Sequence, residues 1–326
     1  MREYQVDIAV IGGGLGGVAA ALAALRAGCR VALTEETDWI GGQLTSQAVP
    51  PDEHPWIEQF GCTASYRPLR AGIREYYRRW FPLAPPFHRA AALNPGGGRV
   101  SRVTCEPRVA LAVLQAMLQP HLSARQLQLF LEHKPFAVET AGDRVLSVAL
   151  RDAAGDEILL RAPYFLDATE LGDLLEPGGI EHVTGAESQA QTGELHAPAE
   201  AQPLNQQSFS VCFAISHHAG ENHVIERPQE YSFWRDYKAD FWPDRNLSWV
   251  YSQPKTLEPR ALGLFAHESD AYSLWEYRRI QQPSQFLPEL FPRTFAGDGI
   301  SLVNWPQMDY WLGPLTGVSE TEKERH

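Results

Sequence analysis

The stretch that decides the fold runs from Asp7 to Glu36, DIAVIGGGLGGVAAALAALRAGCRVALTEE. It carries few charges, and glycine occupies five of the six positions 12–17. A membrane-spanning helix needs about 20 apolar residues, but this density of glycine disfavours a helix through the whole stretch. A secretory signal places positive charge ahead of a short apolar core, whereas Arg2 and Glu3 cancel. We therefore interpret the stretch as a nucleotide-binding turn.

The glycines fall inside a strand, turn and helix pattern. Val6–Ile11 is an apolar, β-rich run typical of a buried parallel strand, and the Ala- and Leu-rich run Leu15–Ala27 predicts a helix. Gly12, Gly14 and Gly17 have the G-x-G-x-x-G spacing, which provides a tight turn, close approach to a pyrophosphate and close contact of helix and strand. We expect the pyrophosphate at the helix N-terminus, where free N–H groups and the dipole favour an anion.

A second strand and an acidic residue complete the pattern. Gly28 suits the end of the helix, and Arg30–Thr34 predicts the next strand. Glu35 follows at 18 residues beyond Gly17, near the usual place of the acidic residue that binds ribose hydroxyls. In this context the glycine motif predicts a dinucleotide site on an α/β fold.

The length is sufficient for two domains, and the composition is typical of a globular protein with a large core. The chain has 326 residues, 44% of them hydrophobic, and 28 basic against 40 acidic residues give a net charge of −12. This balance disfavours a nucleic-acid partner, and no membrane partner is expected. The cysteines lack a C-x-x-C pair, so we expect free thiols in the cytoplasm; the histidine cluster lacks a carboxylate at ligand spacing, so no metal is expected. The cysteines are Cys29, Cys62, Cys105 and Cys212, and the histidine cluster consists of His217, His218 and His223.

Past the second strand the chain leaves the sheet and later returns. The segment TDWIGGQLTSQAVPPDEHPW (37–56) has a glycine doublet and then prolines, which exclude regular helix and central strand. A helical pattern follows at Cys105–His121, and short strands joined by Ala-Gly-Asp turns follow over Leu127–Ala162. Tyr164–Leu166 predicts a buried strand that ends in a turn of small residues, Asp167–Asp173, where backbone can approach a cofactor.

The order of these pieces resembles the FAD-dependent oxidoreductases of glutathione-reductase-like fold, in the group that contains the flavin portion of heterodisulfide-reductase-like proteins. The resemblance rests on the glycine turn with Glu35 and on WIGGQLTSQAV (39–49), FGCTASYRPLRAGIREYYRRW (60–80), FLDATELGDLL (165–175) and LVNWPQMDYWLG (302–313). It implies a Rossmann-like FAD-binding domain, with a parallel sheet and an inserted β-ribbon, and a mixed α+β substrate or cap domain.

The resemblance also implies which residues hold FAD. The glycine turn contacts the pyrophosphate, Glu35 contacts the adenosine ribose, and the doublet and the residues after it run toward the flavin half. The turn at Asp167–Asp173 approaches the cofactor. The expected cofactor-binding residues are Gly12, Gly14, Leu15, Gly16, Gly17, Glu35, Glu36, Gly41, Gly42, Gln43, Thr45, Gln47, Ala168, Thr169, Gly172 and Asp173.

Two features depart from the family pattern. Relatives are expected to hold adenine through backbone groups of the strand at Lys134–Phe136, but Pro135 has no N–H; the adenine edge is held differently, or the alignment is shifted by one residue. The family's late strand and helix beside the flavin have no counterpart after Gly313. Ser319 and Glu322 have capping-box spacing, so we interpret the chain as C-terminally incomplete, with a polar frayed tail as the alternative.

The substrate side is less specific. Arg70, Arg74 and Arg78 repeat every four residues and share one helical face. Such a stripe either binds a carboxylate or phosphate substrate through paired guanidinium contacts or forms a solvated face with local ion pairs. Arg70 and Tyr66 are the residues expected to bind substrate under the first interpretation. Cys62 is interpreted as an inert thiol, and no catalytic residue is identified.

These patterns define a domain organisation and a function. We expect a FAD-binding domain at 1–180 with an irregular insert at about 50–100, a substrate or cap domain at 181–303, and a truncated return to the first domain at 304–326. The predicted activity is hydride transfer between a small organic substrate and non-covalently bound FAD. The alternatives are a flavin electron-transfer subunit resembling heterodisulfide reductase, which should carry clustered cysteines, and a non-catalytic, degenerate FAD-binding protein.

Overall fold

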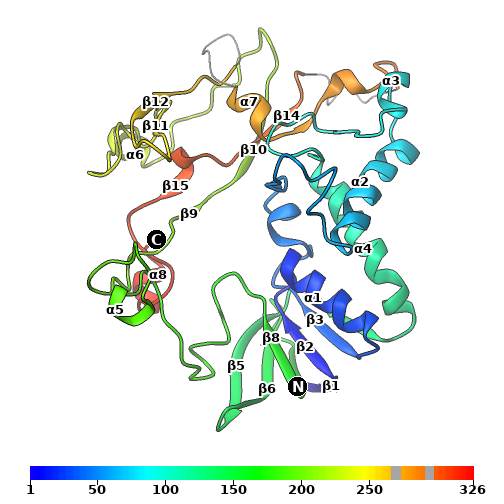
Figure 1. Ribbon diagram of the computed structural model, residues 1–326, viewed down its shortest axis with the longest axis vertical. Helices are drawn as coiled ribbons and strands as arrows, with labels where there is room; N and C mark the ends of the chain where they lie inside the picture. Colours follow the sequence, from blue (N-terminus) through cyan, green and yellow to red (C-terminus); the bar gives the residue numbers. More distant parts are fainter. Residues whose placement is uncertain (266–272, 291–296) are drawn as a thin grey trace. The chain divides into compact units, whose positions relative to one another are not determined.

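The computed structural model describes residues 1–265, 273–290 and 297–326 (Figure 1). Two parts of the expected substrate or cap domain, 266–272 and 291–296, lie outside the described residues. The chain forms two compact units. The first unit comprises Met1–Gly42, Leu114–Phe209 and Tyr310–His326, and the second comprises Gln43–Val113 and Ser210–Asp309. The segment expected as an irregular insert at about 50–100 lies in the second unit.

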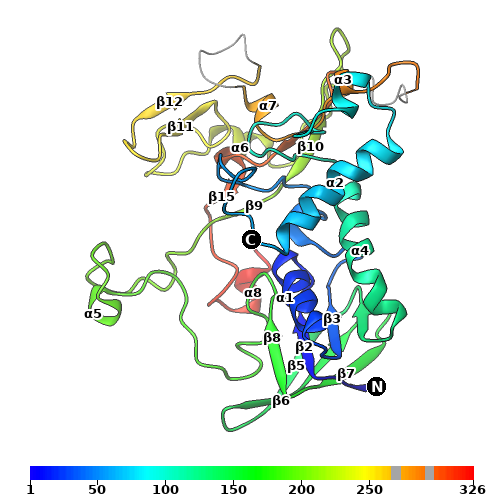
Figure 2. The same ribbon diagram turned by 45° about the vertical axis from the view of Figure 1, so that its right-hand side comes forward.

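The first unit is built on a parallel sheet in the order β4-β3-β2-β8. The apolar residues of β3 are all buried, and those of β2 nearly so, as expected for strands covered on both faces. α1 lies along β2 and β3 (Figure 2) and buries its Ala- and Leu-rich face against them. The predicted order of strand, glycine turn, helix and strand is confirmed. The elements of this unit are β1 (Arg2–Gln5), β2 (Ile8–Ile11), α1 (Leu15–Arg26), β3 (Val31–Thr34), β4 (Leu127–Phe130), β5 (Lys134–Ala141), β6 (Arg144–Arg151), β7 (Glu157–Arg161), β8 (Tyr164–Asp167), α5 (Gln189–Thr192) and α8 (Glu320–Lys323).

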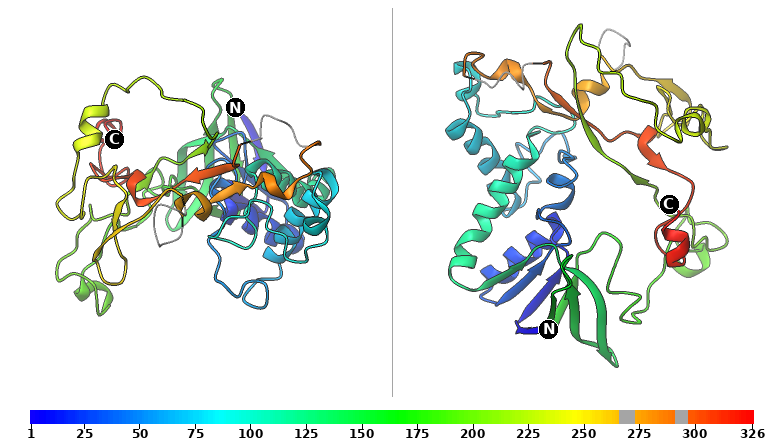
Figure 3. Two further views of the ribbon diagram at one scale, coloured as in Figure 1. Left: turned by 90° about the horizontal axis from the view of Figure 1, so that it is seen from above. Right: turned by 180° about the vertical axis from the view of Figure 1, so that it is seen from behind.

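A second sheet of the same unit has the order β1-β7-β6-β5 and is drawn mainly in green in Figure 3. β1 runs parallel to β7, and β5, β6 and β7 form an antiparallel ribbon. One hydrophobic cluster joins the two sheets, because apolar side chains of β2 and β3 pack with those of β6 and β7. Its buried members are Val6, Ala9, Ile11, Ala32, Val148, Leu150, Ile158, Leu160 and Leu174. The predicted α/β fold with an inserted ribbon is confirmed.

One expectation about the parallel sheet is wrong. The run Tyr164–Leu166 was expected to form a buried strand, but Tyr164 is 69% exposed and Leu166 is 40% exposed. The physical reason is position: β8 stands at the end of the strand order, next to β2. An edge strand has a neighbour on one side, so apolar composition alone does not ensure its burial.

The second unit combines helices with short antiparallel sheets, β10-β14-β13 and β11-β12. Val303 and Trp305 anchor one of its apolar clusters, and Leu302 anchors another. Its elements are α2 (Tyr66–Trp80), α3 (Pro85–His88), β10 (Phe213–Ser216), α6 (Tyr231–Asp236), β11 (Val250–Ser252), β12 (Pro259–Ala261), α7 (Leu274–Tyr277), β13 (Arg279–Gln281), η3 (Pro283–Gln285), β14 (Ile300–Val303) and η5 (Pro306–Met308). The elements that span a unit boundary are η1 (Gly42–Leu44), α4 (Pro107–Ser123), β9 (Phe209–Ser210) and β15 (Asp309–Tyr310).

Candidate functional site

The carboxyl ends of three parallel strands meet at one edge of the first unit. Val10 pairs with Leu33, and Ile11 pairs with Asp167, so β2, β3 and β8 end at nearly the same level. The residues that follow them are Gly12, Glu35 and Ala168. This edge is where open α/β sheets bind their ligands.

The glycine turn is closed to any larger residue at two positions. Gly12 has φ +100°, and a Cβ placed on it would lie 2.2 Å from the Ala168 carbonyl oxygen. A Cβ on Gly17 would lie 2.0 Å from the Gly12 carbonyl oxygen, whereas one on Gly16 would meet no atom within 4 Å. Gly12 therefore allows the end of β8 to approach the turn, and Gly17 allows α1 to start directly above it.

The first turn of α1 presents backbone N–H groups without a capping side chain. Gly14 is the N-cap residue and makes no side-chain cap hydrogen bond. The first backbone hydrogen bond of the helix runs from the Val18 N–H to the Gly14 carbonyl at 2.9 Å, so the N–H groups of Leu15, Gly16 and Gly17 precede the helical ladder. Free N–H groups and the helix dipole make this a suitable place for an anion.

The glycine doublet lies against the glycine turn. The Gly41 N–H donates to the Gly13 carbonyl at 2.8 Å, and Gly41 forms a parallel bridge with Gly14. A Cβ on Gly42 would lie 3.1 Å from the Gly14 Cα. The structure thus brings together two glycine segments that the sequence separates by about 25 residues.

Glu35 is buried beside the turn, with 7% of its surface exposed. Its Oε2 accepts a hydrogen bond from the Gly13 N–H at 3.0 Å, and its Oε1 accepts from the N–H and the hydroxyl of Thr37 at 3.0 and 2.9 Å. The carboxylate is therefore held in one orientation at the end of β3. Glu36 lies farther out and forms a salt bridge of 3.0 Å with Lys134.

The turn after β8 is closed by its own side chains. Oδ1 of Asp167 accepts from the N–H and hydroxyl of Thr169 at 3.0 and 2.7 Å, and its Oδ2 accepts from the Leu174 N–H at 3.1 Å. The Asp173 N–H donates to the Thr169 hydroxyl at 2.8 Å, and the Ala168 N–H donates to the Ile11 carbonyl at 2.7 Å. These bonds fix the turn next to Gly12.

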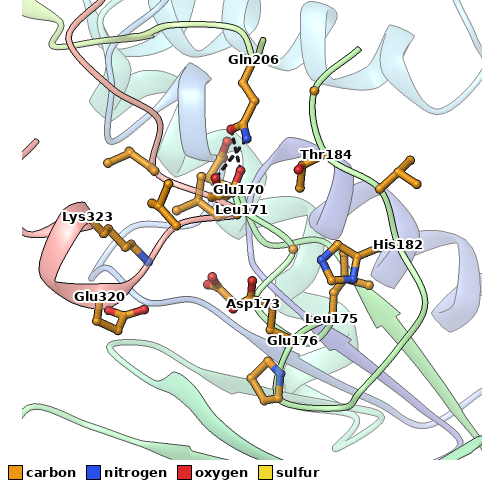
Figure 4. A pocket seen from close by; sticks show the side chains of 18 of the residues that line it. Glu170, Leu171, Asp173, Leu175, Glu176, His182, Thr184, Gln206, Glu320 and Lys323 are labelled. Atoms are coloured by element: carbon orange, nitrogen blue, oxygen red, sulfur yellow. Dashed lines mark hydrogen bonds between the residues drawn. The ribbon is translucent and has the colours of Figure 1, made fainter. Parts of the chain in front are cut away.

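A pocket of about 900 Å³ opens beside this turn. Figure 4 shows Lys323 and Glu320 on one side of it, His182 and Thr184 on the other, and Asp173 between them. Gly172 and Asp173 were expected from the sequence to bind the cofactor, but most of the lining was not. The strand Lys134–Phe136, which the sequence had connected with adenine, also lines the pocket. The segments of the lining that the sequence missed are His182–Gly185, Asn205–Gln207 and Leu315–Lys323, and the capping spacing of Ser319 was the signal near the last of them.

Three expected flavin-side residues belong to the second unit, which begins at Gln43. The Gln43 carbonyl accepts from the Val49 N–H at 2.8 Å. Thr45 is buried, with 1% of its surface exposed, whereas Gln47 is exposed. They follow the glycine doublet directly in the chain.

Of the arginine stripe of α2, Arg70 and Arg74 form neither a solvated face nor an open anion site, whereas Arg78 forms a local ion pair of 3.8 Å with Glu75. Arg70 and Arg74 are buried. Arg70 donates to Glu53 through Nε at 2.7 Å and to Glu58 through Nη2 at 2.8 Å, and Arg74 also pairs with Glu58. Tyr66 donates its hydroxyl to Glu53 at 2.8 Å. Arg70 was expected either to bind an anionic substrate or to lie on a solvated face. Instead, its four hydrogen bonds to carboxylates use four of its five guanidinium donors.

The carboxylates of this network are held in their charged form. Hydrogen bonds from Arg74 and Arg70 lower the pKa of Glu58 to about 2. Burial alone would raise the pKa of Glu53, but hydrogen bonds from Arg70, Ser101 and Tyr66 outweigh it and lower the pKa. The network therefore contributes to the stability of the second unit at neutral pH.

The comparison with protein families agrees with the glycine site. The sequence matches the family model for FAD dependent oxidoreductase over residues 7–326. The chain belongs to the FAD-dependent oxidoreductase family. The cofactor of this family is FAD, so the cofactor expected from the sequence is confirmed.

Several solved structures are similar to part of this chain. They include L-proline dehydrogenase from P. horikoshii, with 18% identity, a TM-score of 0.28 and coverage of 52% of this chain and 23% of that one. Quinol fumarate reductase from E. coli has 18% identity, a TM-score of 0.33 and coverage of 52% and 33%. 3-Ketosteroid-delta4-(5alpha)-dehydrogenase from Rhodococcus jostii has 18% identity, a TM-score of 0.30 and coverage of 51% and 46%. The match thus covers less than half of each of these proteins. A search of curated proteins finds no match.

Two further observations concern other kinds of site. Along the described ranges of this FAD-dependent oxidoreductase, no helix has the length and apolarity needed to cross a membrane. In the same part of the chain, no three His, Cys, Asp or Glu side chains are grouped so that they could hold a metal ion. The four cysteines are free thiols.

Proposed function

We propose that the first unit binds the ADP half of FAD along the carboxyl edge of its parallel sheet. The pyrophosphate lies at the start of α1, against the N–H groups of Leu15 and Gly16. The ribose hydroxyls donate to Glu35. The observation that carries this proposal is the close packing at Gly12 and Gly17, where a Cβ would meet backbone oxygen at 2.2 and 2.0 Å.

Glu35 and the start of α1 fit such a ligand in hydrogen bonding. Glu35 uses three hydrogen bonds inside the protein, and a carboxylate offers about four acceptor positions, so an acceptor position is left for a ribose hydroxyl. No side chain caps α1, so its first N–H groups are available to phosphate oxygens. Gly41 and Gly42 bring a second glycine segment against the turn, where a Cβ on Gly42 would lie 3.1 Å from the Gly14 Cα and 3.3 Å from Oε1 of Glu170.

We propose further that the protein is an oxidoreductase acting on a small organic substrate. FAD bound at this edge would supply hydride transfer, and the protein would orient both partners and exclude water. Gln43, Thr45 and Gln47, which follow the doublet in the chain, would bind the flavin half. The quoted segment LVNWPQMDYWLG (302–313) supports a place near the heterodisulfide-reductase-like flavin proteins. The four free, scattered cysteines support hydride transfer over an iron–sulfur electron-transfer subunit, and they also support a location in the cytoplasm.

The test compares three ligands on the purified chain. FAD and ADP share the half that this edge is proposed to hold, and FMN lacks it. We expect calorimetric titration to show binding of FAD and ADP in competition with each other, and no competition by FMN. FMN that displaces FAD, or ADP that does not, would overturn the proposed binding mode.

A further inference from the structure

Arg278, in the second unit, is a buried cation whose charge is weakly paired. Its exposed fraction is 9%. Its Nε and Nη1 are buried and have no hydrogen-bond partner among the residues that the structure describes. Its Nη2 lies 3.4 Å from Oδ2 of Asp52, whereas a charge-assisted hydrogen bond of this kind measures about 2.7–2.9 Å. The guanidinium group therefore keeps donors that the described part of the chain does not use.

Arg70 and Arg74, which are also buried, show how this protein otherwise treats a buried guanidinium group. Arg70 makes four hydrogen bonds to carboxylates. Arg74 donates to the Leu93 carbonyl at 2.8 Å and pairs with Glu58. A buried donor without an acceptor costs free energy. Arg278 therefore differs from the other two arginines in a way that an anionic ligand would correct.

The free donors of Arg278 suit a group with two acceptor oxygens. A guanidinium group carries five N–H donors in a planar fork, and two adjacent donors along one edge match the two oxygens of a carboxylate. The contact with Asp52 involves Nη2 alone. Whichever Nη2 hydrogen takes part, the Nε–Nη2 edge or the Nη1–Nη2 edge keeps both of its donors. The unused edge is therefore shaped for a bidentate carboxylate.

The charges near Arg278 favour a ligand with a single negative charge. Asp52 already places one carboxylate at 3.4 Å. Burial raises the pKa of the nearby Cys212 thiol; the charge of Arg278 opposes this rise, and the charge of Asp309 adds to it. Two acidic residues thus offset the one guanidinium charge. A phosphate ester, with about two negative charges at neutral pH, would be repelled more strongly than a carboxylate.

Apolar side chains lie beside the same arginine. The Cζ of Arg278 is 5.2 Å from the ring centroid of Tyr277. The Leu302 N–H donates to the Arg278 carbonyl at 3.1 Å. Leu302 belongs to an apolar cluster whose other buried members are Val49 and Ile280, and Cys212 packs against this cluster. These neighbours suit an organic anion whose remaining atoms are apolar.

Arg278 is also joined to the segment that is proposed to bind the flavin half. That segment comprises residues 43–47, and Val49 and Asp52 follow it within the second unit. Asp52 stands five residues beyond Gln47, so their Cα atoms are at most about 18 Å apart. A ligand at Arg278 would therefore be bound close to the segment with the proposed flavin contacts.

We propose that Arg278 binds the carboxylate of the substrate and that the substrates are monocarboxylic acids with a largely apolar body. This inference rests on the proposed function, because it names the substrate class of that oxidoreductase. The Asp52 side chain is 65% exposed, so it can turn to water when the carboxylate of the ligand takes its place. Arg278 thus has the role that the sequence suggested for Arg70, whose donors are engaged inside the protein.

The test measures the binding of propanoate and propanamide, which have the same body and differ in charge. The proteins are the FAD-loaded wild type, Arg278→Met, Arg278→Lys, Asp52→Asn and the control Asp236→Asn, which removes another exposed carboxylate of the second unit. Circular dichroism first establishes that each variant is folded, and calorimetric titration establishes that it binds FAD. Ligand-observed NMR titration then gives the two dissociation constants, and sulfate serves as a competing dianion.

We expect the wild type to prefer propanoate to propanamide by about ten-fold or more, the size expected for hydrogen bonds to a charged group. In Arg278→Met the ratio should fall to near one, and Arg278→Lys, which keeps the charge but not the two-donor edge, should lie between. Asp52→Asn should bind propanoate about two- to five-fold more tightly, as expected for loss of an exposed opposing charge. Asp236→Asn should bind it as the wild type does.

Urea unfolding gives a readout that separates ligand binding from a structural role. Because Arg278 has few partners to lose, Arg278→Met should unfold at the same urea concentration as the wild type or a higher one. An arginine that served only the fold would instead destabilise the protein on removal. If Arg278→Met does not fold, that structural role is indicated and the inference fails.

Three results would overturn the role of Arg278 or the substrate class and leave the proposed function in place. They are an acid-to-amide ratio that Arg278→Met does not change, no binding of propanoate by the folded wild type, and displacement of propanoate by sulfate at concentrations below those at which propanoate itself binds. Failure of the folded wild type to bind FAD would instead overturn the proposed function.

Discussion

Replacing Gly17 by alanine should push α1 away from the glycine turn. A Cβ at this position lies 2.0 Å from the Gly12 carbonyl oxygen, and ordinary contact begins near 3.4 Å. The carbonyl and the helix must therefore separate by roughly 1.4 Å. Gly16 is a matched control, because it precedes Gly17 in the same helical turn and its Cβ would meet no atom within 4 Å. Alanine is a better helix former than glycine at either position, by about 1 kcal/mol, so only the contact differs.

We expect Gly17→Ala to lower the free energy of unfolding by about 1–3 kcal/mol, the usual cost of overpacking, and Gly16→Ala to leave it unchanged or raise it. Gly17→Ala should also weaken FAD binding by about ten-fold or more, about 1.4 kcal/mol, because the first N–H groups of α1 move with the helix. Urea unfolding followed by circular dichroism measures the first effect, and calorimetric titration with FAD measures the second. Equal effects of the two alanines on the free energy of unfolding, the property for which Gly16→Ala is the control, would refute the reasoning.

Three other predictions concern single side chains. Glu35→Gln should weaken FAD binding by about 1.5–3 kcal/mol, the range for hydrogen bonds to a charged group, and Glu36→Gln should weaken it less; calorimetry with the reverse order would move the ribose contact by one residue. The depressed pKa of Glu58, about 2 against an ordinary 4.5, gives stability that is present above pH 4.5 and lost as the pH falls toward 2. Between pH 4.5 and pH 2 the free energy of unfolding of the wild type should fall by about 2 kcal/mol more than that of Glu58→Gln, allowing for the partial exposure of Glu58. Equal dependence of the two proteins on pH would contradict this. Arg70→Ala should lower the free energy of unfolding by about 3–5 kcal/mol, because buried carboxylates lose their partner. The exposed control Arg67→Ala should change it by less than about 0.5 kcal/mol, and similar losses in both variants would show that the Arg70 ion pairs add nothing.

The first strand, turn and helix could be predicted from sequence because the interactions that define them are local. Apolar runs indicate the strands, the glycine spacing indicates the turn, and Glu35 follows the second strand at a characteristic distance. The Ser319 hydroxyl likewise accepts from the Glu322 N–H at 3.3 Å, as its capping spacing predicted. Such signals depend on neighbours within a few residues, so one sequence is enough to identify them.

The partners of the arginine stripe could not be predicted in the same way. The periodicity of Arg70 and Arg74 correctly placed them on one face of a helix, but it does not say what that face meets. Glu53 and Glu58 lie in an irregular, proline-containing segment 12 to 17 residues before Arg70, where no period predicts position. Burial of charge depends on such non-local pairing. The exposure of Tyr164 likewise depends on a non-local property, the position of β8 at the edge of the sheet.

The pocket shows a further limit of sequence patterns. Its walls combine Lys134–Phe136 with Leu315–Lys323, segments separated by most of the chain. Pro135 signalled a departure from the family pattern, but nothing in the sequence around it indicated that residues 315–323 would line the same pocket. Only the fold brings these segments together.

The most direct test of the proposed site is a crystal structure of the chain grown with ADP. We predict one ADP at the carboxyl edge of the parallel sheet, with its diphosphate at the N–H groups of Leu15 and Gly16 and its ribose hydroxyls within hydrogen-bonding distance of Glu35. An ADP ordered at another place, with the turn at Gly12–Gly17 free of ligand at saturating concentration, would contradict the site and the function proposed from it.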